Sequence, residues 1–587
     1  PAPATHALPG ETWREALARR ARCAAARQLL RRGQVRTPAD LITHNLDILR
    51  FALDAAAACE SPADLRALWG ALRGLTVLDP TCGAGAFLLA AARVLEPLYH
   101  ACLGRMDTLA HGDADLQRAL EEADRPPGRR ANVLATILAD NLYGVDILPE
   151  AVEVCRMRLA LEYAARLQPP PAHQRDEAEP GPKGCSHAAA IASEAAERCS
   201  NPAPAHESGA GGEGLPAREA ALVSRAMKLP HLHAGDALDA ELWPTAFPRV
   251  MQEGGFDAVI GNPPYVALAG TRAMYAARGY TTAAGGNLYA LVVERALALL
   301  RSGGRLGVIV PLAAVSTGGM AALQALYAPH EQWHSHFAVR PARLFDGVDM
   351  NLTISLLRKA QGACHTTGYR RWSDGALSER PHLFTTLAYT RNPRLPTHAN
   401  PFPKLGSPLE ARILERMLAH GRRLGDYVTP GGITLYYHSG GRYWRKALTT
   451  KLSSHYKPIT VAPEHAPAVF GLLNSQLFYW YWIGNSNCMD VVSREVLGLP
   501  VFALERADRG AFAELMEELL AAYAGARRTR ARRGARIRVD EANFEVARAR
   551  PVIDAIDGLL ARCYGLDEEE LDFIRSYDLK HRARGGS

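Results

Sequence analysis

The chain lacks the cysteine pattern of a metal-binding or disulfide-stabilised protein. Its ten cysteines are scattered along 587 residues, and none forms a C-x-x-C pair. This distribution favours buried or free thiols in a reducing compartment. The histidine pairs His231/His233 and His334/His336 have no third ligand at a suitable spacing, so we expect no metal.

Long apolar runs and a secretory leader are also missing. No run of about 18 apolar residues occurs, so we expect no membrane span. Glu11–Arg32 is rich in Ala and Arg and predicts an amphipathic helix rather than a signal peptide. We therefore expect a cytoplasmic, nucleoid-associated protein. About 32 residues precede the segment 33–360 in which we expect the main domain, so we expect no fused N-terminal nuclease domain.

Aromatic residues are few, at 7%, whereas 48% hydrophobic and 22% charged residues are ordinary for a globular protein. The net charge of +7 permits a polyanionic partner without requiring one. The segment 168–225 is rich in Pro, Ala, Gly, Ser and Glu. Because such a composition buries little apolar surface, it predicts a largely disordered insertion.

From Leu75 onward, short apolar runs alternate with helical patterns, which predicts a doubly wound, mostly parallel sheet. After the helix at Glu11–Arg32, a single helix is expected at Ala39–Ala58, and a further short helix is expected at Asp64–Leu72. Strands are expected at Leu75–Leu78, Leu142–Asp146, Leu229–Ala234, Phe256–Ile260, Arg305–Val310 and Leu352–Arg358. The main helices are expected at Ala86–Tyr99, Arg130–Asp140, Pro149–Leu167 and Leu288–Leu300. Domain boundaries are expected after a helical segment 1–32 and near residue 360.

The first expected strand runs into Asp79-Pro80-Thr81-Cys82-Gly83-Ala84-Gly85-Ala86-Phe87. Glycines let a ligand approach the backbone, and the following helix N-terminus offers free N–H groups. Asp79 can accept a hydrogen bond from an ammonium group but would repel a phosphate. The motif therefore favours the methionine part of S-adenosylmethionine over a dinucleotide.

Two further strands also end in acidic residues. Asp146 is positioned to accept ribose hydroxyls, and Ile147 to pack on an adenine. Asp236, followed by Ala237, is positioned to accept a bond from the adenine amine. Taken singly, each aspartate is at least as typical of a helix cap or turn.

The fourth strand end, Asn262-Pro263-Pro264-Tyr265, is the most specific motif. Two prolines fix the backbone and remove two N–H donors. The Asn262 side-chain oxygen and the Pro263 carbonyl can then accept bonds from one –NH2 group. That geometry draws the nitrogen lone pair out of conjugation, so that it can attack a methyl sulfonium, and Tyr265 is positioned to stack on the planar target.

Together these motifs resemble those of gamma-class DNA adenine methyltransferases from bacterial restriction–modification and phage-defence systems. In that family D-P-x-x-G-x-G-x-F binds the methionine part of the cofactor and N-P-P-Y holds a flipped base, and both motifs are complete here. A Thr37-Pro38 segment before the cofactor motifs fits the family's order. By this resemblance the cofactor residues are Thr37, Pro38, Asp79, Pro80, Gly83, Gly85, Phe87, Asp146, Ile147, Asp236 and Ala237.

The resemblance implies a class I, Rossmann-like methyltransferase domain over 33–360 and a mixed α/β target-recognition domain over 361–587. It implies S-adenosylmethionine as cofactor, double-stranded DNA as partner, and methylation of the adenine 6-amino group by Asn262, Pro263, Pro264 and Tyr265. A separate nuclease or defence-complex subunit is a further expected partner. Cytosine methylation is disfavoured, because that group more often carries Ser in place of Asn262.

The C-terminal half supplies the DNA-binding candidates. Seven arginines within 527–538 predict a phosphate-binding patch, although a solvated loop or helix is the plain alternative. A loop-like stretch around Tyr436 and Arg442 mixes aromatic and basic groups. Phe478–Trp482 is aromatic throughout and favours a buried core over base stacking. The DNA-binding candidates are Arg527, Arg528, Arg530, Arg532, Arg533, Tyr436 and Arg442.

Two other functions stay open. N-P-P-Y also serves methyltransferases that act on RNA or on protein glutamine, although those are usually smaller. A DNA-binding subunit of a defence complex, active only with partners, is the alternative from a different class.

Overall fold

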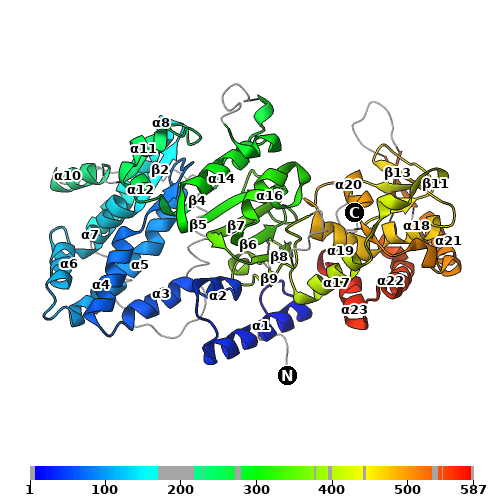
Figure 1. The fold of residues 1–587 in the computed structure, drawn as a ribbon, viewed down its shortest axis with the longest axis horizontal. Coiled ribbons are helices and arrows are strands. Elements are labelled where there is room, and N and C mark those ends of the chain that lie inside the picture. Colours follow the sequence, from blue (N-terminus) through cyan, green and yellow to red (C-terminus); the bar gives the residue numbers. More distant parts are fainter. Residues whose placement is uncertain are drawn as a thin grey trace.

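The computed structural model is elongated, and chain order broadly follows its long axis from blue and cyan through green to yellow and red (Figure 1). The first helix, α1 (Trp13–Arg31), departs from this order and lies along the lower edge in the middle of the molecule. The structure describes residues 7–168, 217–228, 230–270, 279–375, 378–393, 400–440, 444–525, 527–531, 540–544 and 546–582.

A nine-stranded sheet has the order β3-β2-β1-β4-β5-β7-β6-β8-β9. The first five strands in this order are parallel, whereas β7 is antiparallel to both of its neighbours. Strand order reverses between β1 and β4, and open α/β sheets bind ligands at the carboxyl edge of such a switch point. The strands are β1 (Val77–Asp79), β2 (Leu142–Asp146), β3 (His231–Ala234), β4 (Phe256–Gly261), β5 (Leu300–Pro311), β6 (His330–Phe337), β7 (Leu352–Gln361), β8 (Cys364–Arg370) and β9 (Thr390–Arg391).

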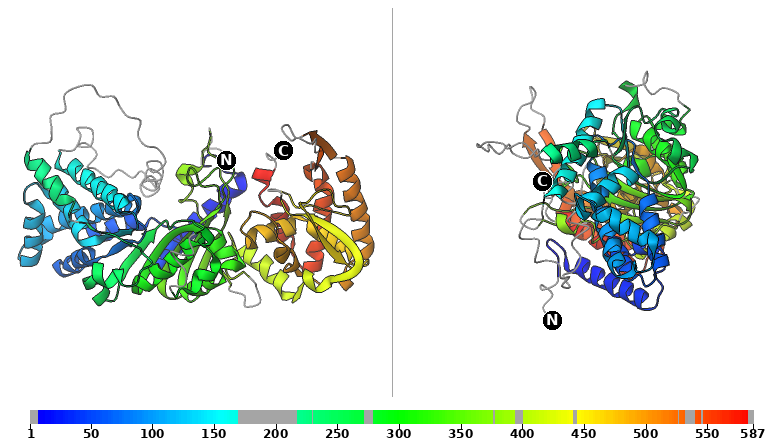
Figure 2. Two further views of the ribbon diagram at one scale, coloured as in Figure 1. Left: turned by 90° about the horizontal axis from the view of Figure 1, so that it is seen from above. Right: turned by 90° about the vertical axis from the view of Figure 1, so that its left-hand side faces the viewer.

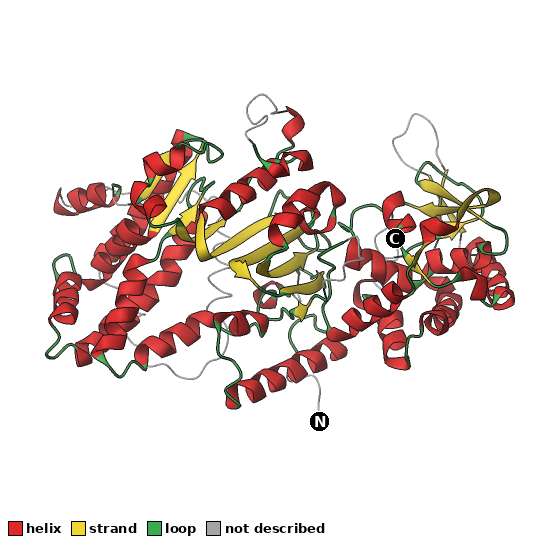
Figure 3. Cartoon of the chain, viewed as in Figure 1, coloured by secondary structure: helices red, strands yellow, loops and turns green. Residues whose placement is uncertain are grey.

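Helices cover both faces of the parallel strands (Figure 3). Because side chains alternate along a strand, Val77 packs into one layer and its neighbour Leu78 into the other. The first layer contains α4 (Pro62–Gly74), α5 (Ala86–Leu109), α6 (Ala114–Asp124), α7 (Arg129–Thr136) and α8 (Pro149–Leu167). The second contains α11 (Leu242–Ala246), α12 (Pro248–Gln252), α14 (Leu288–Leu299), α15 (Ala313–Ser316) and α16 (Ala321–Tyr327). The predicted doubly wound parallel sheet is confirmed.

Helix α5 extends ten residues beyond its predicted end at Tyr99 and contains Pro97. It is the one helix among the described residues that is long and apolar enough, by length and composition, to cross a membrane. The core helix of a globular protein meets the same criterion. Here Leu88, Leu95 and Leu103 of α5 are buried in the first helical layer.

Two expectations for the N-terminal part need correction. The single helix expected at Ala39–Ala58 is divided into α2 (Pro38–Thr43) and α3 (Ile48–Ala57). Asn45 between them has φ +50°, a left-handed conformation that ends a helix. The expected insertion 168–225 also includes ordered structure, since α10 (Ala217–Ala226) occupies its last part. Residues 169–216 lie outside the described part of the chain.

The C-terminal half has a core of its own, at the opposite end of the long axis from the first strands (Figure 2, left). Its three-stranded sheet has the order β12-β11-β13, and β10 pairs with β14. The strands are β10 (Arg422–Arg423), β11 (Val428–His438), β12 (Ala447–Leu448), β13 (Tyr456–Val461) and β14 (Pro500–Val501). The helices are α17 (Pro408–Ala419), α18 (Ala466–Asn474), α19 (Gln476–Asn485), α20 (Ser493–Leu497), α21 (Arg509–Gly525), α22 (Arg550–Tyr564), α23 (Glu568–Ser576) and α24 (Leu579–Arg582). The aromatic run Phe478–Trp482 is fully buried in α19, which confirms its predicted core role.

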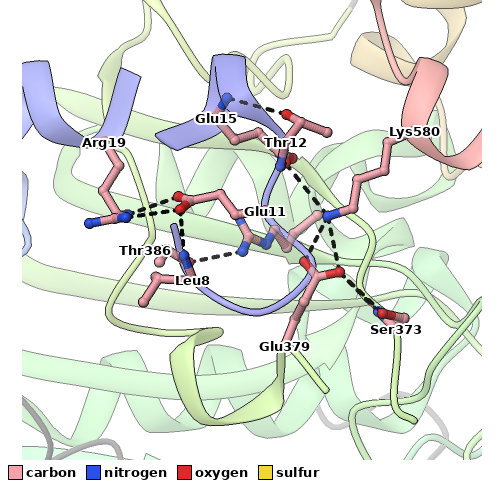
Figure 4. Close-up of polar contacts among 10 residues, drawn as sticks. Leu8, Glu11, Thr12, Glu15, Arg19, Ser373, Glu379, Thr386 and Lys580 are labelled. Carbon is pink, nitrogen blue, oxygen red and sulfur yellow. Dashed lines mark hydrogen bonds and ion pairs between the residues drawn. The ribbon is translucent and has the colours of Figure 1, made fainter. Parts of the chain in front are cut away.

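Polar contacts join the two halves to the N-terminal segment (Figure 4). The Lys580 ammonium lies 3.0 Å from the buried carboxylate of Glu379 and 3.6 Å from Glu15 at the start of α1. Arg371 after β8 forms a buried ion pair with Asp578 at the C-terminal end. Removal of one partner from a buried ion pair costs about 3–5 kcal/mol. These contacts therefore fix the position of the C-terminal end relative to the segments that carry Glu15, Arg371 and Glu379.

Candidate functional site

The turn after β1 is built for close approach to the backbone. Gly83 and Gly85 have φ +50° and +80°, which L-residues with a side chain rarely adopt. A Cβ on Gly85 would also overlap the Cys155 sulfur of α8. The Cys82 N–H donates to the Val145 carbonyl at 2.9 Å, so the turn is tied to the next strand. Gly85 is the N-cap of α5 and accordingly brings the free N–H groups of that helix to the switch point.

Asp79 lies at the end of β1 and is 1% exposed. Its Oδ1 accepts a hydrogen bond from the Thr81 N–H at 3.1 Å. Burial, with a smaller contribution from the charge of Asp146, raises the pKa of Asp79 to about 7. The Thr81 hydroxyl beside it is buried, with no hydrogen-bond partner among the described residues. The turn therefore presents a carboxyl group and a hydroxyl that can each form further hydrogen bonds.

We expect Asp79→Asn to change the pH dependence of stability in a defined direction. Because the native pKa lies above the ordinary value of 3.8, the folded state keeps a proton that the unfolded state releases between about pH 4 and 7. The contribution of Asp79 to stability is thus lost as pH rises through this window. The free energy of unfolding of the variant, minus that of the wild type, should grow by up to about 1.4 kcal/mol per pH unit. Urea unfolding of both proteins at pH 5 and pH 8 measures this difference, and parallel profiles would show that Asp79 does not titrate there.

Asp146 at the end of β2 connects two loops of the same edge. Its Oδ2 accepts from the Gly83 N–H at 2.9 Å, and its Oδ1 accepts from the Leu148 N–H at 3.0 Å. Asp146 thus acts as a local turn cap and also fixes the glycine turn. Ile147 and Leu148 beyond it are 45% and 58% exposed, an apolar surface open to a planar ligand.

The remaining predicted cofactor residues occupy varied environments. The Asp236 Oδ1 accepts from the Leu238 N–H at 2.9 Å, and Ala237 is buried in the core near Trp243. Thr37 caps α2, and the described hydrogen bonds of its side chain are with Asp40. Pro38 begins α2, Pro80 is buried, and Phe87 is half-buried near the start of α5. The structure therefore brings Asp79, Gly83, Gly85 and Asp146 together, whereas no described contact joins Thr37 to the glycine turn.

The N-P-P-Y loop follows β4, next to β1 in the sheet. A Cβ on Gly261 would lie 2.9 Å from Asp79 Oδ1, so the loop begins directly against the Asp79 carboxyl. Asn262 is exposed, Pro263 is buried, and Pro264 is half-buried. The motif predicted for a planar target therefore adjoins the turn predicted for the cofactor.

Tyr265 adopts an arrangement different from the expected stacking position. Its hydroxyl lies 2.6 Å from Asn262 Oδ1 and 3.1 Å from the Ile309 carbonyl, and donates to both. Its ring packs edge-on against Tyr289, at 6.3 Å between centroids. Burial raises the pKa of Tyr265, so the hydroxyl keeps its proton. In this conformation the Tyr265 hydroxyl is hydrogen-bonded to Asn262 Oδ1, the oxygen that we predicted to accept a bond from the target amine.

The DNA-binding candidates are only partly described. Arg527, Arg528 and Arg530 lie on β15 (Arg527–Ala531), which pairs with β16 (Asp540–Phe544). Arg442, Arg532 and Arg533 lie outside the described residues. The loop expected around Tyr436 was wrong, because Tyr436 is half-buried in β11, opposite Leu448 of β12.

Three contributors to the site were missed from the sequence: Gly261, Cys155 and Ile309. Gly261 is required because Asp79 lies against it, and Cys155 fills the space beside Gly85. Ile309 contributes only its backbone carbonyl. Of the three, Gly261 carried a local signal, since a glycine ending a buried strand suggests close approach of another group.

Two of the loops at this edge lie within a segment that matches a known family model. Residues 140–328 match the model of the Eco57I restriction-modification methylase family. This match includes the second cofactor loop and the N-P-P-Y loop, and it covers about a third of the chain. No curated protein matches the chain at a significant level.

Among solved structures, the type IIL restriction-modification enzyme MmeI in complex with DNA matches with a TM-score of 0.52 and 12% identity, over 91% of this chain and 76% of that one. The DrdV–DNA complex gives 0.37 and 10%, over 84% and 57%. The M protein of the type I restriction enzyme EcoKI gives 0.29 and 13%, over 60% and 55%. This chain thus spans little more than half the length of the latter two. The similarity to MmeI and the strand order confirm the predicted Rossmann-like fold of S-adenosylmethionine-dependent methyltransferases.

Proposed function

We propose that this protein is a DNA methyltransferase that transfers a methyl group from S-adenosylmethionine to the 6-amino group of an adenine flipped out of DNA. One observation carries the proposal: the Asn-Pro-Pro-Tyr loop begins against Asp79, at the switch point of the sheet. The family match over the same loop supports a restriction-modification methylase. A role in restriction–modification or phage defence, in the cytoplasm, follows from that family and is part of the proposal.

The residues of the glycine turn fit the proposed cofactor. The buried carboxyl of Asp79 suits the methionine ammonium, and the buried Thr81 hydroxyl can form a further hydrogen bond. Gly83 and Gly85 leave the backbone open, and Ile147 and Leu148 offer an apolar face to adenine. When bound, S-adenosylmethionine supplies an electrophilic methyl group on a sulfonium. Asp79, Asp146 and the turn would hold and orient it.

Asn262 and Pro263 would align the target amine. Two carbonyl oxygens that accept from one –NH2 group pull the nitrogen toward tetrahedral geometry, with its lone pair directed at the methyl group. Asn262 Oδ1 has a second lone pair for the target amine, and release of this oxygen by Tyr265 would free the tyrosine ring to stack on the base. An adenine reaches this loop only after leaving the duplex, at a cost of a few kcal/mol.

The C-terminal half, residues 361–587, would read the target sequence, and 33–360 would perform the transfer. The arginines of β15 would contact phosphates, which provide affinity but carry no sequence information. Tyr436 and Arg442 are retained as proposed DNA contacts. Separate nuclease or defence subunits fit the same family context, and we propose no metal for the transfer step.

Mapping of methylated adenines in DNA from cells that express the chain tests the proposal. We expect 6-methyladenine at one recurrent sequence, absent from cells without the gene. A labelled-cofactor assay of purified protein with DNA, RNA and protein separates the alternatives. Label in RNA or in glutamine, with none in DNA, would overturn the DNA proposal. Methylation of DNA that appears only after an extract is added would identify a partner-dependent subunit.

A further inference from the structure

Helix α1 is unusual because it is ordered but scarcely buried. Of its 19 residues Ala16 alone is buried, and Trp13, Leu17 and Leu30 are exposed. Most helical stability in proteins comes from packing of an apolar face. Figure 2 (right) shows the helix in dark blue, projecting at the edge of the molecule.

The fixed part of α1 is its N-terminal end (Figure 4). Thr12 and Glu15 form a reciprocal cap, and the Glu11 carboxylate accepts from Arg19 at 2.8 Å. Lys580 lies 3.6 Å from Glu15, and Arg14 lies 2.9 Å from Asp572 of α23. The N-terminal end of α1, up to Arg19, is therefore anchored to the C-terminal half of the protein, and the rest of the helix extends beyond these contacts.

The part of the chain that covers the last two thirds of α1 and the few residues after it concentrates positive charge. Residues 19–36 contain seven arginines and no acidic residue, in a chain whose net charge is +7. Arg20, Arg27 and Arg31 are exposed, and no described residue forms an ion pair with them. At about 100° per residue their spacings of seven and four place them within about 40° of arc, and at 1.5 Å per residue they span about 16 Å. We name these three residues the arginine stripe.

The charge pattern argues against a role in helix stability. Like charges at spacing four, as in Arg27 and Arg31, weaken an isolated helix. A polyanion laid along the stripe would remove this repulsion. Duplex DNA carries one negative charge per about 1.7 Å of axis, and guanidinium groups bind phosphate oxygens in a bidentate manner.

We propose that the arginine stripe binds phosphates of double-stranded DNA outside the sequence that the protein recognises. The proposal deepens the proposed function and rests on it, because it assigns a second, sequence-independent contact to the same DNA substrate. The anchors at Glu15 and Arg14 would fix this contact relative to the C-terminal half. The acidic surface of another protein is the competing occupant.

Salt-dependent binding tests the stripe. We expect the triple variant Arg20→Gln/Arg27→Gln/Arg31→Gln to lower the slope of log K against log salt by about 2 to 3, since each phosphate contact contributes about 0.9. The probe is a 40-bp random-sequence duplex, and the readout is fluorescence anisotropy. The control Arg118→Gln/Arg125→Gln/Arg249→Gln removes the same charge from exposed positions elsewhere and should keep the wild-type slope. Circular dichroism checks that both variants are folded.

A wild-type slope in the stripe variant would overturn the proposal. The proposal would also be overturned if the variant keeps the salt slope of DNA binding but no longer binds poly-glutamate. The stripe would then bind the acidic surface of another protein. An equal loss in both triple variants would also overturn it, as a non-specific charge effect. Methyl transfer is assayed separately, so failure of the catalytic proposal would appear as absent 6-methyladenine and not as a changed slope.

Discussion

Asn262→Ala is expected to lower the rate of DNA methylation by at least about 10²–10³-fold, the range found when one preorganised polar group is removed from a reacting centre. The variant loses the side-chain oxygen that would draw the amine out of conjugation, and Pro263 alone would hold the target. Asn262 is exposed, so stability should change by no more than about 0.5 kcal/mol. Single-turnover transfer from labelled cofactor measures the rate, and calorimetric titration measures cofactor affinity, which should persist.

Tyr265→Phe is the matched control for Asn262→Ala. It removes the hydroxyl that holds Asn262 Oδ1 but keeps the ring and both acceptor oxygens. Its methylation rate should therefore stay well above that of Asn262→Ala. Wild-type methylation by Asn262→Ala would remove Asn262 from the catalytic assignment, whatever the behaviour of Tyr265→Phe.

The elements around the site were predictable because their ends carry local signals. Strand β2 and helix α8 have the predicted bounds, Leu142–Asp146 and Pro149–Leu167. The strand is an apolar run that ends in an aspartate, and the helix begins with a proline at its first position. Both features act within a few residues, so the sequence alone reveals them.

Strand β6 was missed because most of its buried residues are polar. It contains His334 and His336, both 0% exposed, and therefore shows no apolar alternation. Ser355 and Thr353 of β7 satisfy these rings, at 2.9 Å and 2.5 Å. Those partners lie about 20 residues away in the chain. The burial of the two histidines is therefore explained only once β6 is known to pair with β7.

The motifs of the site were predictable, but its contacts were not. The sequence identified Asp79 and Asn262 as ligand-facing candidates at strand ends. It did not reveal that Gly261 brings their loops together, or that Tyr265 binds Asn262 instead of standing free. These facts depend on which strands are neighbours and on how the side chains of the two loops pack, and neither is a local property.

Gly85→Ala should weaken cofactor binding more than any other single methyl addition in the turn. Gly85 has φ +80°, and a left-handed conformation costs a residue with a side chain about 1–2 kcal/mol. The added Cβ would also overlap the Cys155 sulfur, so the turn must move away from α8. If the strain alone is relieved by displacement of the turn, affinity falls about 5- to 30-fold, and the overlap adds to this loss. Calorimetric titration with S-adenosylmethionine or its demethylated product measures it.

Gly83→Ala provides the internal comparison, because Gly83 has φ +50° but open space where its Cβ would lie. It carries conformational strain without the clash, so its affinity should fall less than that of Gly85→Ala. Adding Cys155→Ala to Gly85→Ala removes the overlapping sulfur and should restore part of the lost affinity, while Cys155→Ala alone reports any effect of the cavity. Equal losses at the two glycines, with no rescue by Cys155→Ala, would mean that the Gly85 position is set by its backbone conformation alone and not by packing against α8.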